Sequence, residues 1–160
     1  MAFARTRRSM VAATLFFLAL GAAASVAQAA GGPCLRNGER SAAATRMLQS
    51  ELMVAALSCR ESEAYGRFVH RFEDQLVTHG HRLRTAFRRA HGGAARAQMS
   101  RFVTGLANQA SARAARQGKA YCAKADALFD KVLAVPPTRL AAFAESRPTA
   151  DDHGLPACRS

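Results

Sequence analysis

The sequence predicts an all-α protein, a small bundle of about four helices that two disulfide bonds hold together. Apolar residues recur at three- and four-residue intervals along most of the chain, which is the pattern of amphipathic helices. No stretch alternates apolar and polar residues long enough to predict a strand, and β-branched residues are few. The chain also carries an even number of cysteines behind a predicted export signal, a combination that favours disulfide bonds.

Residues 1–29 have the features of a signal peptide. A basic start, MAFARTRR, precedes an apolar run, and Ala27-Gln28-Ala29 supplies the small residues that signal peptidase reads. We expect cleavage after Ala29 and a periplasmic or secreted protein. The apolar run is shorter than the roughly 20 residues of a membrane-spanning helix, and no second run follows it. No transmembrane anchor is therefore expected after cleavage; an uncleaved N-terminal anchor is the alternative interpretation.

Residues 30–160 have the length of a single helical domain. The first helix is expected over residues 41–59, with Ser41 as its N-terminal cap. The second covers residues 61–91 and ends before a glycine pair, where the chain can change direction. Gly80 falls in its middle, which predicts either a kink or two shorter helices.

Two more helices and an irregular tail are expected after the glycine pair. The third helix runs from about residue 94 to 117, and the fourth from Lys119 to Ala134. Val135-Pro136-Pro137 ends the fourth, because proline supplies no amide donor and clashes with the preceding turn. Beyond about residue 135 the only helical candidate is the short segment 138–145.

The four cysteines favour one of three possible pairings. Cys59 closes the first helix and Cys122 begins the fourth, so a bond between them would tie the ends of the hairpin that the second and third helices form. Cys34 and Cys158 would then pair and gather the two ends of the domain. No CxxC or CxxCH spacing occurs, which leaves a redox pair, a zinc ribbon and covalent haem attachment without support.

Three segments and the cysteine frame resemble a known group of proteins. The segments are LQSELMVAALSC (48–59), YGRFVHRF (65–72) and FVTGLANQAS (102–111), followed by Tyr121-Cys122. They are similar to a group of small exported bacterial all-helical proteins that has no assigned function. The resemblance covers roughly residues 34–130. It implies a shared helical bundle and secretion, and it implies nothing about chemistry.

The charge of the chain is strongly positive and unevenly distributed. The formal net charge is +12, and without residues 1–29 the remaining 20 basic and 11 acidic residues give +9. Gln75 to Ala125 contain no acidic residue and ten basic ones. Such a segment attracts phosphate- or carboxylate-rich surfaces. The residues that we expect to bind an anion are Arg82, Arg84, Arg88, Arg89 and Arg96.

This basic segment predicts a binding or structural role in the cell envelope, without enzymatic activity. The expected partner is an anionic lipid headgroup or polysaccharide, or another protein. Export and the lack of exposed aromatic residues argue against nucleic acid, which proteins bind through base stacking. A solvated helix face, enriched in arginine by a GC-rich genome, is the alternative interpretation.

The histidines define the rival hypothesis, a metal-binding protein or enzyme centred on residues 79–91. His79 and His81 form an HxH pair, and imidazole is a common metal ligand. Residues two apart diverge by about 200° around a helix, so the pair can share a metal only if Gly80 unwinds the chain. No nucleophile motif or carboxylate pair predicts a catalytic residue, and no cofactor is expected.

One polar group of side chains is expected to have a structural role. Thr104, Asn108 and Ser111 lie along one edge of the third predicted helix, beside its apolar stripe. At that position they would form a buried hydrogen-bonded seam against the second helix.

Overall fold

The computed structural model describes residues 32–159, and the predicted signal peptide, residues 1–29, lies outside this range. The described chain contains no strand, only an isolated bridge between Leu35 and Ala157. The predicted all-α bundle is therefore confirmed. Its α-helices are α1 (Glu39–Cys59), α2 (Ser62–Arg71), α3 (Glu73–His91), α4 (Ala95–Gln117), α5 (Lys119–Leu133) and α6 (Leu140–Glu145), with short 3-10 helices η1 (Gly92–Ala94) and η2 (Pro137–Arg139).

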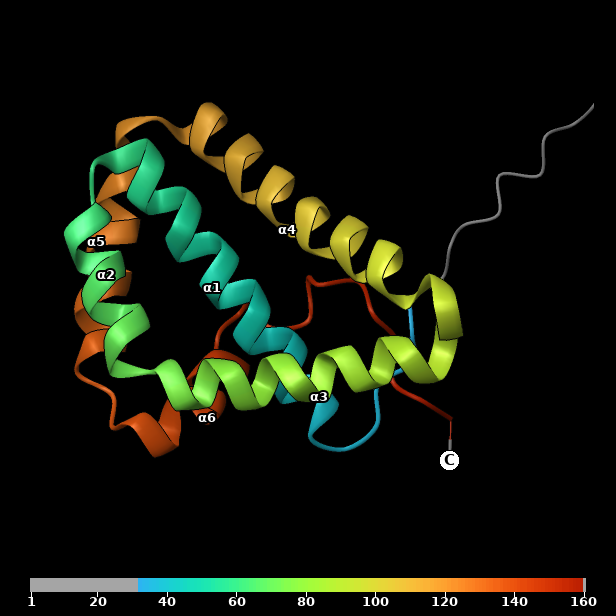
Figure 1. Ribbon diagram of the computed structural model, residues 1–160. Coiled ribbons are helices and arrows are strands. Elements are labelled where there is room, and N and C mark those ends of the chain that lie inside the picture. The colour runs from blue at the N-terminus through green and yellow to red at the C-terminus, as the bar shows by residue number, and fades with distance from the viewer. Residues whose placement is uncertain (1–31, 160) are drawn as a thin grey trace, which may run out of the picture.

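Helix α1 is the centre of the bundle. It runs through the middle of the molecule and contacts each of the other five α-helices (Figure 1). Small and apolar residues cover almost its entire circumference, as is typical of a buried helix. The helix begins after Gly38, whose positive φ of 79° suits glycine, so the expectation that Ser41 caps it is wrong.

The segment 61–91 is broken at Phe72, not at Gly80. Phe72 has a φ of −113° and ψ of 15° and separates α2 from α3, whereas Gly80 lies within the continuous helix α3. The break allows one apolar stripe to serve two clusters of buried residues. Phe68 and Phe72 pack in the first cluster, while Leu83 and Phe87 pack in the second.

Helix α4 covers one side of α1 through a narrow apolar edge. Leu106 and Ala110 are buried on this edge. Thr104, Asn108 and Ser111 are exposed, so the predicted buried polar seam is wrong. Residues two apart point to nearly opposite sides of a helix, and Leu106 is the residue that faces the core in this stretch.

The two disulfide bonds confirm the preferred pairing. Cys59, the last residue of α1, is bonded to Cys122 in α5, and Cys34 is bonded to Cys158. The second bond brings both ends of the described chain together beside the bridge of Leu35 and Ala157. Such bonds are typical of an oxidising, extracytoplasmic environment. Between residues 32 and 159, no helix has both the length and the apolar character needed to cross a bilayer.

Candidate anion-binding site

A sharp corner joins α3 to α4 and creates a pocket between them. Gly92 takes a positive φ of 50°, a conformation that favours glycine, and η1 then turns the chain into α4. The corner is held by Phe87 of α3, whose ring lies 5.5 Å from that of Phe102 in α4. Ala95 is buried in the same cluster. Side chains from the last turns of α3 and the first turns of α4 therefore face one another.

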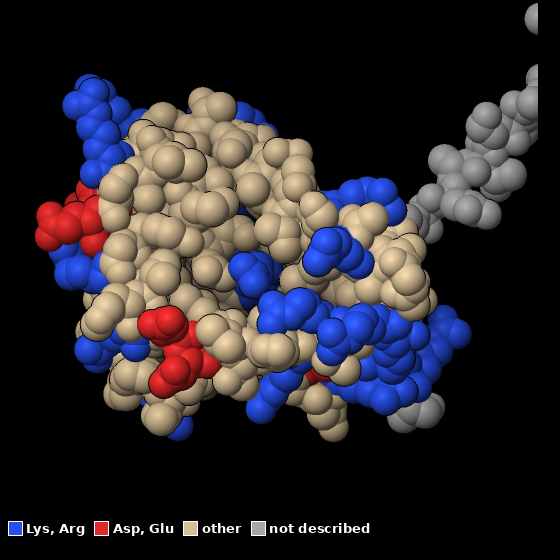
Figure 2. Space-filling view, in the orientation of Figure 1, with Lys and Arg blue, Asp and Glu red and all other residues tan. Residues whose placement is uncertain are grey.

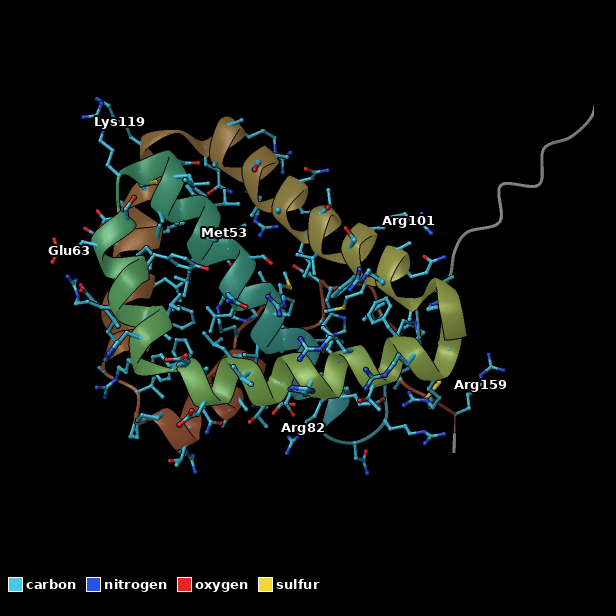
Figure 3. The ribbon with its side chains drawn as sticks, in the orientation of Figure 1. Met53, Glu63, Arg82, Arg101, Lys119 and Arg159 are labelled. Carbon is cyan, nitrogen blue, oxygen red and sulfur yellow. A yellow bond between two sulfur atoms is a disulfide. The ribbon has the colours of Figure 1, made fainter. Side chains whose placement is uncertain are left out.

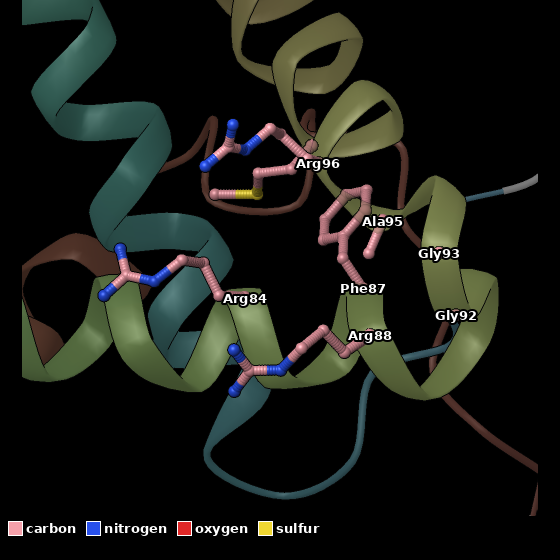
Figure 4. A pocket seen from close by; sticks show the side chains of 8 residues that line it. Arg84, Phe87, Arg88, Gly92, Gly93, Ala95 and Arg96 are labelled. Atoms are coloured by element: carbon pink, nitrogen blue, oxygen red, sulfur yellow. The ribbon is translucent and has the colours of Figure 1, made fainter.

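Three of the five predicted arginines line this pocket. Arg84 and Arg88 come from α3, one helical turn apart, and Arg96 comes from the first turn of α4 (Figure 4). The pocket has a volume of about 380 Å³, and its remaining lining residues are Phe87, Gly92, Gly93, Ala95 and Met99. None of these residues is acidic. We call this set of lining residues the corner pocket.

The positive potential of the corner pocket comes from its side chains. The end of α3 carries partial negative charge and the start of α4 carries partial positive charge, so that the two helix dipoles largely offset one another at the corner. Arg88 donates a hydrogen bond of 3.1 Å to the hydroxyl of Thr85, a neutral group. The guanidinium charges of the pocket are therefore available to a bound anion.

The other two predicted arginines lie outside the corner pocket. Arg82 faces a separate hollow next to His81 and Glu39. Arg89 holds the carboxylate of Glu39 through two hydrogen bonds of 2.5 and 2.8 Å and donates a third to the backbone oxygen of Cys34. Its guanidinium links α3 to the start of α1, which is a structural role within the fold.

The ion pair of Arg89 and Glu39 makes stability depend on acidic pH. The two side chains are 27% and 12% exposed. The hydrogen bonds from Arg89 lower the pKa of Glu39 below its usual value of 4.5, although burial opposes the shift. A lowered carboxyl pKa stabilises the fold above the unfolded pKa, and the contribution disappears as pH falls through the folded pKa.

We therefore expect Glu39→Gln to lower the free energy of unfolding by about 2 kcal/mol at pH 7, the usual contribution of hydrogen bonds to a charged group. The variant should approach the wild type as pH falls below 4.5, because protonation removes the same interaction from the wild type. Urea unfolding between pH 7 and pH 3 measures both effects. A constant difference over this range would contradict the assignment.

The wider surface shows that the positive charges gather near the corner. Lys and Arg side chains cluster over the second half of α3 and its junction with α4, whereas Asp and Glu gather over α2 and the start of α3 (Figure 2). Not every cation of the basic segment belongs to this cluster. Lys119 projects from the far end of the molecule, where α4 meets α5, and Arg101 points outward from α4 (Figure 3).

The structure does not bring the predicted metal ligands together. Helix α3 continues through Gly80, so that His79 is buried while His81 is exposed. Burial and the nearby charge of Arg82 lower the pKa of His79, partly opposed by Glu145. Among residues 32–159, no three His, Cys, Asp or Glu side chains are placed to hold a metal ion together.

Sequence reasoning missed Arg46, a half-buried residue of α1 next to Arg84. A methyl group placed on Gly80 would meet Arg84 Nη1 at 3.4 Å and Arg46 Nη2 at 3.5 Å, so both guanidiniums flank the same point of α3. Burial lowers the pKa of Arg46, Tyr65 raises it, and Arg84 lowers it further. The signal in the sequence is a charged residue within the small and apolar stretch that forms the buried helix α1, whose interior contains only one other charged residue, Glu51.

No protein-family model matches this chain, and neither does any curated protein or solved structure. The resemblance to exported bacterial helical proteins therefore stays a prediction.

Proposed function

We propose that this chain is an exported, non-enzymatic protein that binds an anionic component of the cell envelope through the corner pocket. The observation that carries the proposal is the convergence of Arg84, Arg88 and Arg96 on one pocket whose lining contains no carboxylate. Guanidinium groups bind phosphate and carboxylate through paired hydrogen bonds, which suits lipid headgroups and acidic polysaccharides alike.

The two disulfide bonds support the location that the proposal requires. They join segments 63 and 124 residues apart, and the described chain has no free cysteine. Proteins of oxidising compartments keep such bonds, whereas cytosolic reductants remove them. A periplasmic or secreted location places the corner pocket next to the anionic lipids and polysaccharides of an envelope.

The test compares the salt-dependent anion binding of the wild type with that of a variant in which two pocket arginines are replaced by glutamate. We expect the protein to bind vesicles that contain phosphatidylglycerol, or an acidic polysaccharide, more tightly than their neutral counterparts at low ionic strength. Arg88→Glu combined with Arg96→Glu should weaken this binding at least tenfold, or about 1.4 kcal/mol. Vesicle co-sedimentation and surface plasmon resonance measure the change.

The matched control places the same charge change elsewhere. Arg116→Glu combined with Lys119→Glu alters the net charge equally, but both residues lie at the far end of α4 and the start of α5. Compared at about 0.1 M salt, where charges more than about 10 Å away are largely screened, binding by this control should change less than about threefold. Equal losses in both variants would show that general charge, not the pocket, attracts the anion. Absence of salt-sensitive binding to any of these anions would refute the proposal.

A further inference from the structure

Within residues 32–159, neither Arg46 nor Arg84 forms an ion pair with a carboxylate. Arg46 donates a hydrogen bond of 2.7 Å to the amide oxygen of Gln49, which is neutral, and its buried Nε has no partner among the described residues. Arg84, which also lines the corner pocket, flanks the same point of α3 at Gly80. Arg46 is half-buried and Arg84 is exposed; their like charges repel one another, and each favours an anion placed between them.

Arg46 lies next to the corner pocket on its α1 side, although it is not one of the residues that line it. The side chain of Arg84 points from α3 toward α1, while Arg96 lies above it on α4 (Figure 4). An anionic group beside Arg84 would therefore lie between Arg96, which lines the same pocket, and Arg46, which flanks the same point of α3. Multiple guanidiniums around one position fit a phosphate better than a carboxylate, since phosphate offers more acceptor oxygens and more negative charge.

Apart from Arg84, Arg88 and Arg96, the corner pocket is lined by apolar residues and glycines. Phe87 is only 2% exposed and forms part of the pocket floor, with buried Ala95 and half-buried Met99 beside it. A polysaccharide needs polar partners for its many hydroxyl groups, and the pocket lining supplies no hydroxyl or amide side chain. A flexible methionine next to an aromatic ring is suited to hydrocarbon. Pockets of about 300 to 1,000 Å³ are the usual size for small ligands.

These observations identify the class of ligand, on the basis of the function proposed above. We infer that the corner pocket binds a phosphate-bearing amphiphile: Arg46, Arg84 and Arg96 hold the phosphate, and Phe87, Ala95 and Met99 contact the start of the acyl chain. The envelope component is accordingly a phosphorylated lipid rather than a polysaccharide, and a phosphate monoester fits the guanidiniums best because it has three free oxygens and up to two negative charges.

The test uses dodecyl phosphate, below its micelle concentration, as the probe for the full chain. In isothermal titration calorimetry, we expect dodecyl phosphate to bind at least tenfold more tightly than methyl phosphate, which lacks the long chain. We also expect it to bind more tightly than dodecyl maltoside, which has the same chain but no charge. Met99→Gln should remove most of the preference for the long chain and leave methyl phosphate binding unchanged. Met53→Gln is the matched control, because Met53 is also half-buried but does not line the pocket.

Substitution of Arg46 tests the phosphate position. Arg46→Gln should weaken binding of dodecyl phosphate and methyl phosphate alike by about tenfold. Arg46→Lys keeps the charge but loses the paired hydrogen bonds of the guanidinium, so it should weaken binding less than Arg46→Gln does. Without ligand, the unfolding temperature of Arg46→Gln should not fall, because the substitution removes a repulsion from Arg84. This measurement distinguishes loss of the site from loss of the fold.

The possible outcomes separate this inference from the proposed function. Equal affinity for dodecyl and methyl phosphate, or binding to an acidic polysaccharide alone, would overturn the inference and leave the proposed function standing. Absence of binding to dodecyl phosphate, to phosphatidylglycerol vesicles and to the polysaccharide would overturn both. An unchanged affinity in Arg46→Gln would remove Arg46 from the site and overturn the inference as stated.

Discussion

Replacing Cys59 and Cys122 together by serine is expected to lower the free energy of unfolding by about 4 kcal/mol. The bond joins the end of α1 to α5 across 63 residues, a loop that contains α2, α3 and α4. Without the bond the unfolded chain regains the conformational freedom of this loop, which stabilises the unfolded state. A domain usually has only about 5 to 15 kcal/mol of stability, so the variant should unfold at markedly lower denaturant concentration.

The second disulfide is expected to have nearly the same effect, despite its longer separation. The 124-residue span of Cys34 and Cys158 encloses the 63-residue span of Cys59 and Cys122. While the inner bond is intact, the outer bond constrains only the difference between the two spans, which is close to the length of the inner loop. Replacing Cys34 and Cys158 by serine should therefore also cost about 4 kcal/mol.

Urea unfolding of the two double-serine variants, monitored by circular dichroism, measures these losses of stability. Thiol titration of the wild type checks that both disulfide bonds are formed. Native-state hydrogen exchange distinguishes the variants. Loss of the outer bond should first expose the amides around Leu35 and Ala157, whereas loss of the inner bond should affect the junction of α1 and α5. A loss below about 1 kcal/mol for either pair would contradict the expected constraint.

Local pattern was sufficient to predict most of the helices, and it favoured the observed cysteine pairing without excluding the other two. The third and fourth predicted helices match α4 and α5 within a residue or two, because apolar spacing and the flanking glycine and proline residues act locally. The break at Phe72 could not be predicted in this way. The stripe through Phe68 and Phe72 is compatible with one straight helix, and only packing around α1 requires the chain to bend.

The candidate site, like the fold, could be predicted from local sequence pattern only in part. The absence of acidic residues from Gln75 to Ala125 predicted a basic surface, and three of the five chosen arginines line the corner pocket. The sequence places Arg89 in this basic surface, because nothing near Arg89 in the sequence indicates its ion pair with Glu39, which lies 50 residues away. Arg46 was overlooked for the same reason, since it approaches Arg84 only through the packing of α1 on α3.

A second large effect is expected from the ion pair of Glu51 and Arg147. Arg147 follows α6 and donates a hydrogen bond of 2.6 Å to Glu51 in the middle of α1. The two side chains are only 16% and 14% exposed. Arg147→Ala leaves the carboxylate without its partner in a position that water reaches poorly, so we expect a loss of about 3 kcal/mol in the free energy of unfolding.

A double substitution separates the ion pair from simple packing. Glu51→Met combined with Arg147→Met removes both charges and keeps similar volume, so it should cost less than about 1 kcal/mol, although Arg147→Met alone should remain strongly destabilising. Urea unfolding of the two single variants and the double variant gives the coupling energy. Additive losses would show that the two residues act independently and would contradict the pair.

Tyr121 provides an independent readout of the same carboxylate. Its hydroxyl is buried and has no hydrogen-bond partner among the described residues. Burial is the largest cause that raises the pKa of Tyr121, and the negative charge of Glu51 raises the pKa further. Glu51→Gln removes that charge and should lower the pKa of Tyr121, measured by ultraviolet titration with Tyr121→Phe to subtract the signal of Tyr65. Glu51→Asp, which keeps the charge, should leave the pKa raised. If Glu51→Gln left the tyrosine titration unchanged, the Glu51 carboxylate would not lie close enough to the phenol to act on it, and the arrangement of Glu51, Tyr121 and Arg147 around the middle of α1 would be contradicted.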